Sequence, residues 1–285
     1  MALLEVQGVT VQFGGVTAVN DASLSVEGGT VTGLIGPNGA GKTTLFNVIS
    51  GLQPPNKGRI RFANNDLTKA SVNARAKAGI GRTFQRLEAF GSLTVRENVQ
   101  VARDIHSGTR SWFGRKQEKT VDDLIDRVGV RRYAHQRADS VPTGVARLLE
   151  MARALAIEPR LLLLDEPSSG LDEAETQAFG DLLRALAHDG TAILMVEHDM
   201  DLVMTVCDYI HVLEFGRIIA AGAPEEIRSD RAVQAAYLGF IEDDPGVPAA
   251  LQAISDAAPD DQTRMFSEMA SAETTMELPT VRSDT

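Results

Sequence analysis

A phosphate-binding loop is the clearest chemical feature of the sequence. Residues 31–49, VTGLIGPNGAGKTTLFNVI, place a short apolar run before a glycine-rich turn and a segment with helical spacing. The turn fits G-x-x-x-x-G-K-[ST], in which glycines let main-chain N–H groups surround a polyphosphate. Lys42 then reaches the β- and γ-phosphates, Thr43 offers its hydroxyl to Mg²⁺, and the following helix adds its positive end. The candidate nucleotide-binding residues are Gly36, Pro37, Asn38, Gly39, Ala40, Gly41, Lys42, Thr43 and Thr44.

Two further groups of polar residues follow apolar runs. Asp165 and Glu166 come directly after residues 161–164, whose continuous apolar character predicts a strand buried on both faces. Adjacent carboxylates at such a strand end are costly unless they meet a cation or take part in chemistry. His198 follows a similar run at 191–196, which favours a functional role over the structural or surface role of most histidines. Together these residues argue against the alternative, a glycine-rich turn with a chance Lys-Thr pair.

The elements that must position these residues alternate between strands and helices. Residues 3–7 and 22–26 alternate in polarity and predict an antiparallel strand pair ahead of the loop. Residues 208–222 predict two strands with a turn at 214–216. Helical spacing recurs near residues 94–106, 119–128, 144–156, 174–188 and 224–238. The alternation implies an α/β fold with a parallel sheet flanked by helices and with ligands at the carboxyl ends of its strands.

Composition limits the other possibilities. The chain has a net charge of -11, and residues 243–285 hold nine acidic against two basic side chains, so this segment carries -7 of it. The first 242 residues lack a basic stripe, which makes nucleic acid a poor candidate partner. No signal peptide or long apolar run is evident, and the single Cys207 excludes an internal disulfide, so a reducing cytosolic setting is expected.

The ordered motifs resemble those of the ATP-binding subunit of ABC transporters over nearly all of positions 3–240. GPNGAGKTT resembles the Walker A loop, RTFQ the Q-loop with Gln85, LLLLDEP the Walker B strand, SSGLD the D-loop with Asp172, and EHD the switch with His198. The details RTFQ, SLTVRENV, LEMARALA and AAYLG most resemble the larger ATPase subunit of branched-chain amino-acid uptake systems. The resemblance implies a P-loop NTPase core with an N-terminal antiparallel β subdomain.

The same resemblance implies a domain plan. An ATP-binding domain is expected at 1–242, with a helical subdomain inserted at about 87–143. Residues 243–285 are expected to form a disordered acidic tail, because their Pro, Asp, Ala, Thr and Ser content is too polar to build a core.

The resemblance also implies ATP and Mg²⁺ as cofactors and gives the site residues their roles. Asp165 would hold Mg²⁺ through water, Thr43 would bind it directly, and Gln85 would sense Mg²⁺ and the attacking water. Glu166 would orient or polarise that water, and His198 would contact the γ-phosphate. Phe13 would stack on adenine, although the sequence equally allows a core or turn aromatic at this position.

One motif departs from the family pattern. The usual Leu-Ser-Gly-Gly-Gln is replaced at 141–145, the signature segment, by VPTGV. Pro142 has neither the hydroxyl nor the N–H of a serine, which leaves the Thr143 hydroxyl, Gly144 and the following helix N-terminus to contact a γ-phosphate across a dimer. Proline is tolerated here in the branched-chain subfamily. We therefore expect this segment to complete the weaker of two sites, in a heterodimer with a second, non-identical ATPase subunit, a homodimer being the alternative.

The implied partners are transmembrane permease subunits and, indirectly, a periplasmic or extracellular solute-binding protein. The chain would lie peripherally on the cytoplasmic face of the membrane, with a groove near Leu87, Phe90 and Leu93 receiving a short permease helix. Three alternatives share the ATP site: a lipid or lipopolysaccharide exporter, a soluble ATPase of translation or DNA repair, and a non-hydrolysing regulatory subunit. The RTFQ and AYLG details favour uptake, and the presence of Glu166 and His198 argues against the regulatory subunit.

Overall fold

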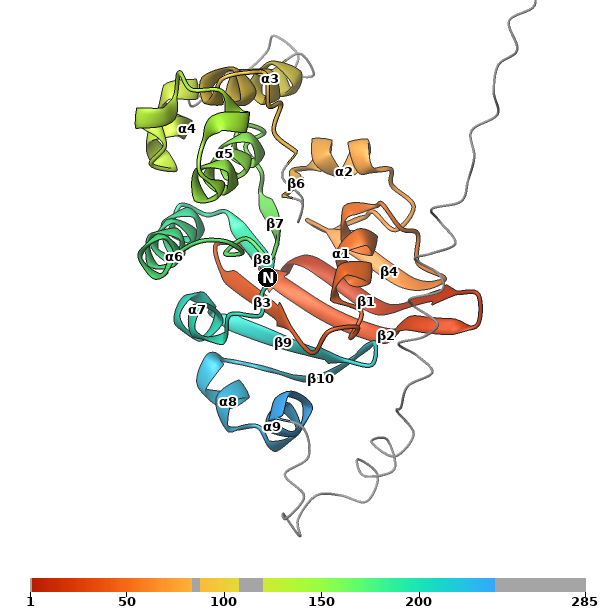
Figure 1. Ribbon diagram of the computed structural model, residues 1–285. Helices are drawn as coiled ribbons and strands as arrows, with labels where there is room; N and C mark the ends of the chain where they lie inside the picture. The colour runs from red at the N-terminus through yellow and green to blue at the C-terminus, as the bar shows by residue number, and fades with distance from the viewer. Residues whose placement is uncertain (1, 84–87, 108–119, 239–285) are drawn as a thin grey trace, which may run out of the picture. The chain divides into compact units, whose positions relative to one another are not determined.

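The computed structural model describes residues 2–83, 88–107 and 120–238 (Figure 1). All of them belong to one compact unit, which contains two β-sheets and the helices that pack around them. Gln85, Leu87 and the tail expected at 243–285 lie outside the described residues.

The first sheet is antiparallel, with the strand order β2-β1-β4-β5. Its strands are β1 (Ala2–Phe13), β2 (Val16–Glu27), β4 (Lys57–Phe62) and β5 (Asn65–Asp66). The strand pair predicted at 3–7 and 22–26 is confirmed, with Leu4 opposite Val26. Both strands are longer than predicted, because a register shift after Val6, where Gly8 has a φ of 58°, lets the pairing continue to the end of β1.

The second sheet has the order β10-β9-β3-β8-β7-β6. Its strands are β3 (Val31–Ile35), β6 (Ile80–Arg82), β7 (Leu161–Asp165), β8 (Ala192–Val196), β9 (Tyr209–Glu214) and β10 (Arg217–Gly222). All neighbours are parallel except β10, which pairs antiparallel with β9 at one edge. The carboxyl ends of the parallel strands β3, β7 and β8 therefore meet at one edge of the sheet.

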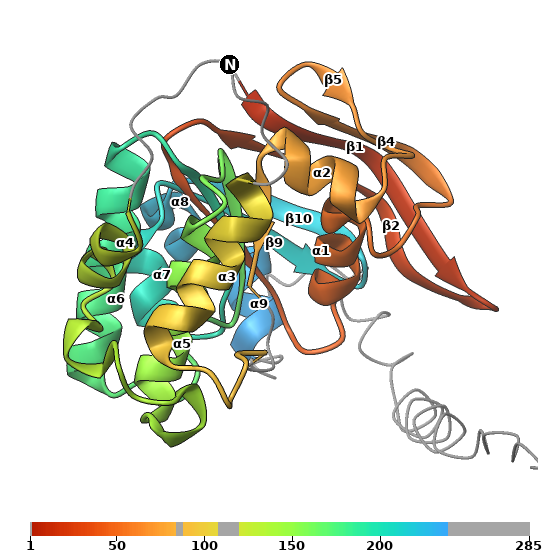
Figure 2. The same ribbon diagram turned by 90° about the horizontal axis from the view of Figure 1, so that it is seen from above.

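Both faces of this sheet are buried. Leu162 and Leu164 of β7 belong to one hydrophobic cluster, which the sheet shares with helices. Leu161 and Leu163 point the other way, into a cluster shared with the antiparallel sheet. Figure 2 shows α4, α6 and α7 on one side of the parallel strands and the antiparallel sheet on the other. This is the two-sided burial that the apolar run predicted.

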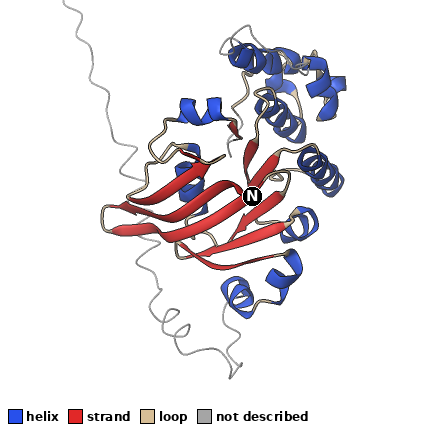
Figure 3. Ribbon diagram, turned by 180° about the vertical axis from the view of Figure 1, so that it is seen from behind, coloured by secondary structure: helices blue, strands red, loops and turns tan. Residues whose placement is uncertain are grey.

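The helices fall into groups along the chain (Figure 3). The phosphate loop leads into α1 (Lys42–Ser50), and α2 (Val72–Ala78), which the sequence did not predict, precedes β6. A cluster of helices follows, in which α3 (Val95–Ser107), α4 (Val121–Arg127) and α5 (Thr143–Leu155) contact one another. The remaining helices are α6 (Glu173–His188), α7 (Met200–Val206), α8 (Pro224–Ser229) and α9 (Arg231–Leu238).

The predicted helices near 94–106, 119–128, 144–156 and 174–188 are confirmed as α3 to α6. The single helix predicted near 224–238 is wrong, because Asp230 separates α8 from α9. Its carboxylate accepts the N–H groups of Ala232 and Val233 and so starts a new helix. The boundaries of a separate helical subdomain at about 87–143 remain a prediction.

Candidate nucleotide-binding site

The phosphate loop runs between β3 and α1 in a backbone conformation that requires glycine. Gly36, Gly39 and Gly41 have φ values of 149°, 80° and 103°. A Cβ on Gly36 would lie 1.9 Å from the carbonyl oxygen of Leu213 in β9. A Cβ on Gly41 would lie 2.4 Å from the carbonyl oxygen of Ala18 in β2. Glycine at these positions therefore lets the loop pack closely against strands of both sheets.

Main-chain hydrogen bonds fix this loop to the turn between β9 and β10, and fix that turn to β2. The N–H of Gly216, between β9 and β10, donates to the carbonyl of Ala40 at 2.9 Å. The carbonyl of Gly216 in turn accepts the N–H of Asn20 in β2 at 2.8 Å. The loop is thus held from behind, while Asn38 and Gly39 at its tip are exposed.

Lys42 begins α1 and lies folded over the loop. Its Nζ donates to the carbonyls of Gly36 and Pro37, at 2.6 and 2.9 Å. Burial lowers the pKa of Lys42, and the carboxylates of Glu166 and Asp165 oppose this shift. The lysine, the phosphate loop and the two carboxylates predicted from separate parts of the sequence are therefore brought together.

The start of α1 is suited to an anion. Gly41 occupies the position before the helix with no side-chain cap, so the first N–H groups of α1 are left for another acceptor. Thr43 is exposed in this first turn, and Thr44 is half-buried behind it. With the Lys42 ammonium, these groups form a donor set that fits the phosphates of ATP.

Asp165, at the end of β7, lies in an ion pair that the sequence did not predict. Its Oδ2 is 3.1 Å from a guanidinium nitrogen of Arg82 in β6, and their side chains are 5% and 9% exposed. The other terminal nitrogen of Arg82 donates to Asn47 Oδ1 and Ser50 Oγ of α1, both at 2.8 Å. Burial raises the pKa of Asp165, and Arg82 opposes that shift. Arg82 thus ties the carboxylate to the helix that follows the phosphate loop.

Glu166 follows in a conformation uncommon for a residue with a side chain. Its φ is 48°, and its N–H donates to the carbonyl of Val196 in β8 at 2.9 Å. A left-handed backbone at a residue other than glycine costs about 1–3 kcal/mol and persists only where the surroundings hold it. Such strain is typical of functional sites.

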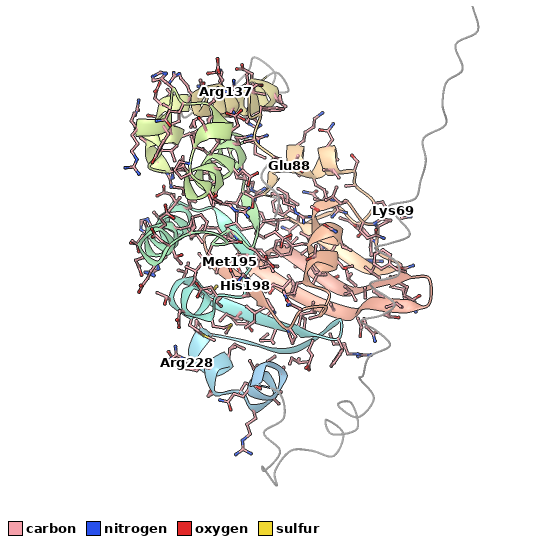
Figure 4. The ribbon with its side chains drawn as sticks, in the orientation of Figure 1. Lys69, Glu88, Arg137, Met195, His198 and Arg228 are labelled. Atoms are coloured by element: carbon pink, nitrogen blue, oxygen red, sulfur yellow. The ribbon has the colours of Figure 1, made fainter. Side chains whose placement is uncertain are left out.

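His198 follows β8 near Met195 (Figure 4). Its side chain is 68% exposed, and its Nδ1 lies 3.8 Å from Oε2 of the preceding Glu197. The exposure leaves the imidazole accessible to a ligand.

The remaining predicted residues lie on other elements. Phe13 ends β1 and is 44% exposed, so it is accessible as an aromatic platform. Thr143 is the first residue of α5, whose N-cap, Pro142, makes no side-chain capping bond. Gly144 is buried, and a Cβ there would lie 2.8 Å from the carboxylate of Glu175 in α6.

Asp172 starts α6. Its carboxylate accepts the Glu175 N–H at 2.8 Å, so it caps this helix within the chain. The structure therefore places the signature segment beside the segment that contains Asp172.

Comparison with known proteins identifies the family. A family model described as "ABC transporter" matches residues 19–169. The branched-chain amino acid transport ATP-binding protein LivG of Salmonella typhimurium is 39% identical over 249 residues, which cover 83% of this chain and 98% of LivG. The chain belongs to the ATP-binding proteins of ABC transporters. As an ABC transporter ATP-binding protein, it is a component of a transporter complex, although no described helix is long and apolar enough to span a membrane.

This ABC ATP-binding protein also matches solved structures. A cassette of an ABC transporter in its ADP conformation has a TM-score of 0.75 and 30% identity, covering 84% of this chain and 100% of that chain. BraF of Pseudomonas aeruginosa, a branched-chain amino acid transport ATP-binding protein, is 38% identical over 249 residues, 83% of this chain and 98% of BraF. A second family model, "Branched-chain amino acid ATP-binding cassette transporter", matches residues 217–239, a segment that includes β10 and α8.

Proposed function

We propose that this ABC ATP-binding protein hydrolyses ATP to drive the import of branched-chain amino acids through membrane permease subunits. The observation that carries the proposal is its 39% identity to LivG over 98% of that protein. The match of residues 217–239 to the branched-chain family model supports import rather than lipid export, because this match lies outside the segment common to ABC transporters.

The nucleotide is held by the phosphate loop. Lys42 exchanges its bonds to the loop carbonyls for the β- and γ-phosphates, and the open N–H groups of α1 donate to the same oxygens. Phe13 stacks on adenine. Thr43, Asp165 and Gln85 provide the oxygen ligands that Mg²⁺ prefers, directly or through water. When bound, Mg²⁺ neutralises charge on the phosphates.

Hydrolysis depends on three side chains of this protein. Glu166 orients the attacking water and accepts its proton, and the strained backbone of Glu166 fixes the direction of its carboxylate. His198, exposed after β8, donates a hydrogen bond to the γ-phosphate. Gln85 helps to place the water. Their contribution is mainly positioning and charge stabilisation.

A second ATPase subunit completes each site. Thr143 and Gly144 at the open start of α5, together with Asp172, face the nucleotide held by the partner subunit. Since Pro142 removes one hydroxyl and one N–H from this surface, the site that it completes is the weaker one, and we propose a non-identical partner with a standard signature. Hydrolysis would then reopen the pair of subunits.

The permease helix docks between β6 and the helical cluster. A cavity of about 200 Å³ there is lined by Thr83 and Arg82 from β6 and its continuation, and by Glu88, Ala102, Glu150 and Arg153. Beside it Phe90 is 47% exposed, with the Arg153 guanidinium 5.2 Å from its ring centre. Figure 4 shows Glu88 between α5 and α2. An apolar ring flanked by positively and negatively charged side chains suits the binding of a short amphipathic helix.

We further propose that the protein lies peripherally on the cytoplasmic face of the membrane. The solute-binding protein is an indirect partner on the other face.

Mild-detergent co-purification from the native membrane, followed by mass spectrometry, tests the proposal. We expect to recover two permease subunits and a second ATPase. When the complex is reconstituted into vesicles, leucine added outside should be taken up only if ATP is present inside the vesicles. A complex carrying Lys42→Ala is the control and should not transport. Recovery of ribosomal or DNA-repair proteins, or uptake that is unaffected by Lys42→Ala, would refute it.

A further inference from the structure

We propose that Glu197 is a positioning residue that holds Glu166 and His198 as one unit, an inference that rests on the proposed ATP hydrolysis. Glu197 directly follows β8 and is only 1% exposed. One oxygen of its carboxylate accepts the N–H of Ser168 at 2.8 Å. The other accepts the N–H of His198 at 3.1 Å. A single rigid carboxylate thus joins the turn after Glu166 to the backbone of the histidine.

The hydrogen bond from the Ser168 N–H to Glu197 holds the backbone two residues after the strained Glu166. Glu166 already donates its N–H to the carbonyl of Val196, the residue before Glu197. The left-handed Glu166 therefore lies between two hydrogen bonds, and both end on consecutive residues of the same strand terminus. Removing the second bond would let the turn relax toward an ordinary backbone and redirect the Glu166 carboxylate.

The same carboxylate orients the histidine. His198 Nδ1 lies 3.8 Å from Glu197 Oε2, so a small rotation of the ring brings the two atoms into hydrogen-bond range. With Nδ1 directed at Glu197, Nε2 is the ring nitrogen left to face a ligand.

Burial of this carboxylate is expensive, which argues that it has a task. Removing an ionised carboxylate from water is strongly unfavourable unless hydrogen bonds or a nearby cation offset the loss. A small hydroxyl or an apolar residue would avoid that penalty, but it could not bridge two N–H groups on separate turns. The bridging geometry is the specific property that only a carboxylate of this length supplies here.

The first test needs no ATPase activity. In the isolated full-length chain, Glu197→Gln replaces one acceptor oxygen by an NH₂ group at nearly constant volume. We expect amide hydrogen exchange to accelerate at least tenfold at Ser168 or His198, with an ATP dissociation constant within about threefold of wild type. Glu226→Gln is the matched control, because Glu226 accepts the Ala223 N–H at 2.8 Å in a remote helix cap. Unchanged exchange at both amides would overturn the proposal, whatever the protein transports.

The second test asks whether Glu197 acts through the histidine. In the assembled complex, we expect Glu197→Gln to lower kcat at least tenfold with little change in KM, and Glu226→Gln to leave both unchanged. In a His198→Ala background the further loss from Glu197→Gln should be clearly smaller than its loss in the wild-type background, since the part transmitted through the histidine is already gone. Losses that multiply, or a wild-type kcat for Glu197→Gln, would overturn it. Absence of hydrolysis by the wild-type complex would instead refute the proposed function, and the exchange measurement would still decide the role of Glu197.

Discussion

Arg75→Met is expected to destabilise the protein strongly, because Arg75 is a buried arginine that bonds only to main-chain carbonyls in the contacts described. It lies in α2 and is 2% exposed. Its guanidinium donates to five carbonyl oxygens at 2.6 to 3.2 Å, which belong to Val48, Ile49, Leu67, Thr68 and Ala70. Two of these carbonyls end α1, so Arg75 closes the helix that begins with Lys42.

The magnitude follows from two opposing effects. Hydrogen bonds from a charged donor contribute about 1.5–3 kcal/mol each, and leaving buried carbonyls without a donor costs about 1–3 kcal/mol each. Against this, removal of a guanidinium from water costs several kcal/mol, and burial accordingly lowers the pKa of Arg75. Some carbonyls will regain water in the variant. We therefore expect a net loss of about 3–5 kcal/mol in the free energy of unfolding.

Urea unfolding followed by circular dichroism measures this loss. Arg75→Lys should lie between wild type and Arg75→Met, because an ammonium has three donors in place of the five of a guanidinium. Lys77→Met, on the exposed side of the same helix, is the control and should stay within about 0.5 kcal/mol of wild type. A loss below about 1 kcal/mol for Arg75→Met would show that the carbonyls find other partners and would refute this reasoning.

Three further predictions concern other parts of the molecule. Gly36→Ala should abolish ATP binding by calorimetry, because its Cβ would lie 1.9 Å from the Leu213 carbonyl oxygen, whereas Gly15→Ala, with open space around it, should bind normally. Burial raises the pKa of Glu150, so the folded protein loses stability relative to the unfolded chain as the pH rises from the ordinary range of a glutamate through that raised pKa. Glu150→Gln should therefore show a flatter stability profile than wild type over that range, measured by urea unfolding at a series of pH values, and a profile parallel to wild type would contradict this. Thr143→Ala should lower ATPase activity of the assembled complex severalfold, and no loss would remove its hydroxyl from the proposed site.

The sequence was sufficient for the parts of the site that depend on local spacing. The phosphate loop, the carboxylates at Asp165 and Glu166, and His198 each adjoin an apolar run, and such runs became the buried strands β3, β7 and β8. Two-sided burial of a parallel sheet leaves a strong pattern, and a ligand site at the strand ends follows from topology. The roles of individual residues remain predictions.

The supporting side chains could not be predicted, since their partners are distant in the sequence. Arg82 and Asp165 are separated by 83 positions, and Glu197 and Ser168 by 29. In the sequence, Arg82 and Glu197 look like ordinary charged residues beside better-known motifs. Arg75 is harder still, because a buried arginine with carbonyl partners requires no complementary acidic residue, and α2 around it is mostly exposed and lacks an apolar stripe.

The attachment of the phosphate loop has an evolutionary consequence. The bonds from Asn20 to Gly216 and from Gly216 to Ala40 join main-chain atoms only, so they do not depend on which side chain stands at position 20, while Ala40 is buried and leaves little room for a larger one. The side chain at position 20 can therefore change without displacing the loop, whereas Gly36 and Gly41 cannot gain a side chain, because a Cβ there would collide with a main-chain carbonyl oxygen. The position of the phosphate loop is thus fixed by main-chain geometry. A comparison of side chains alone would underestimate how strongly that position is constrained.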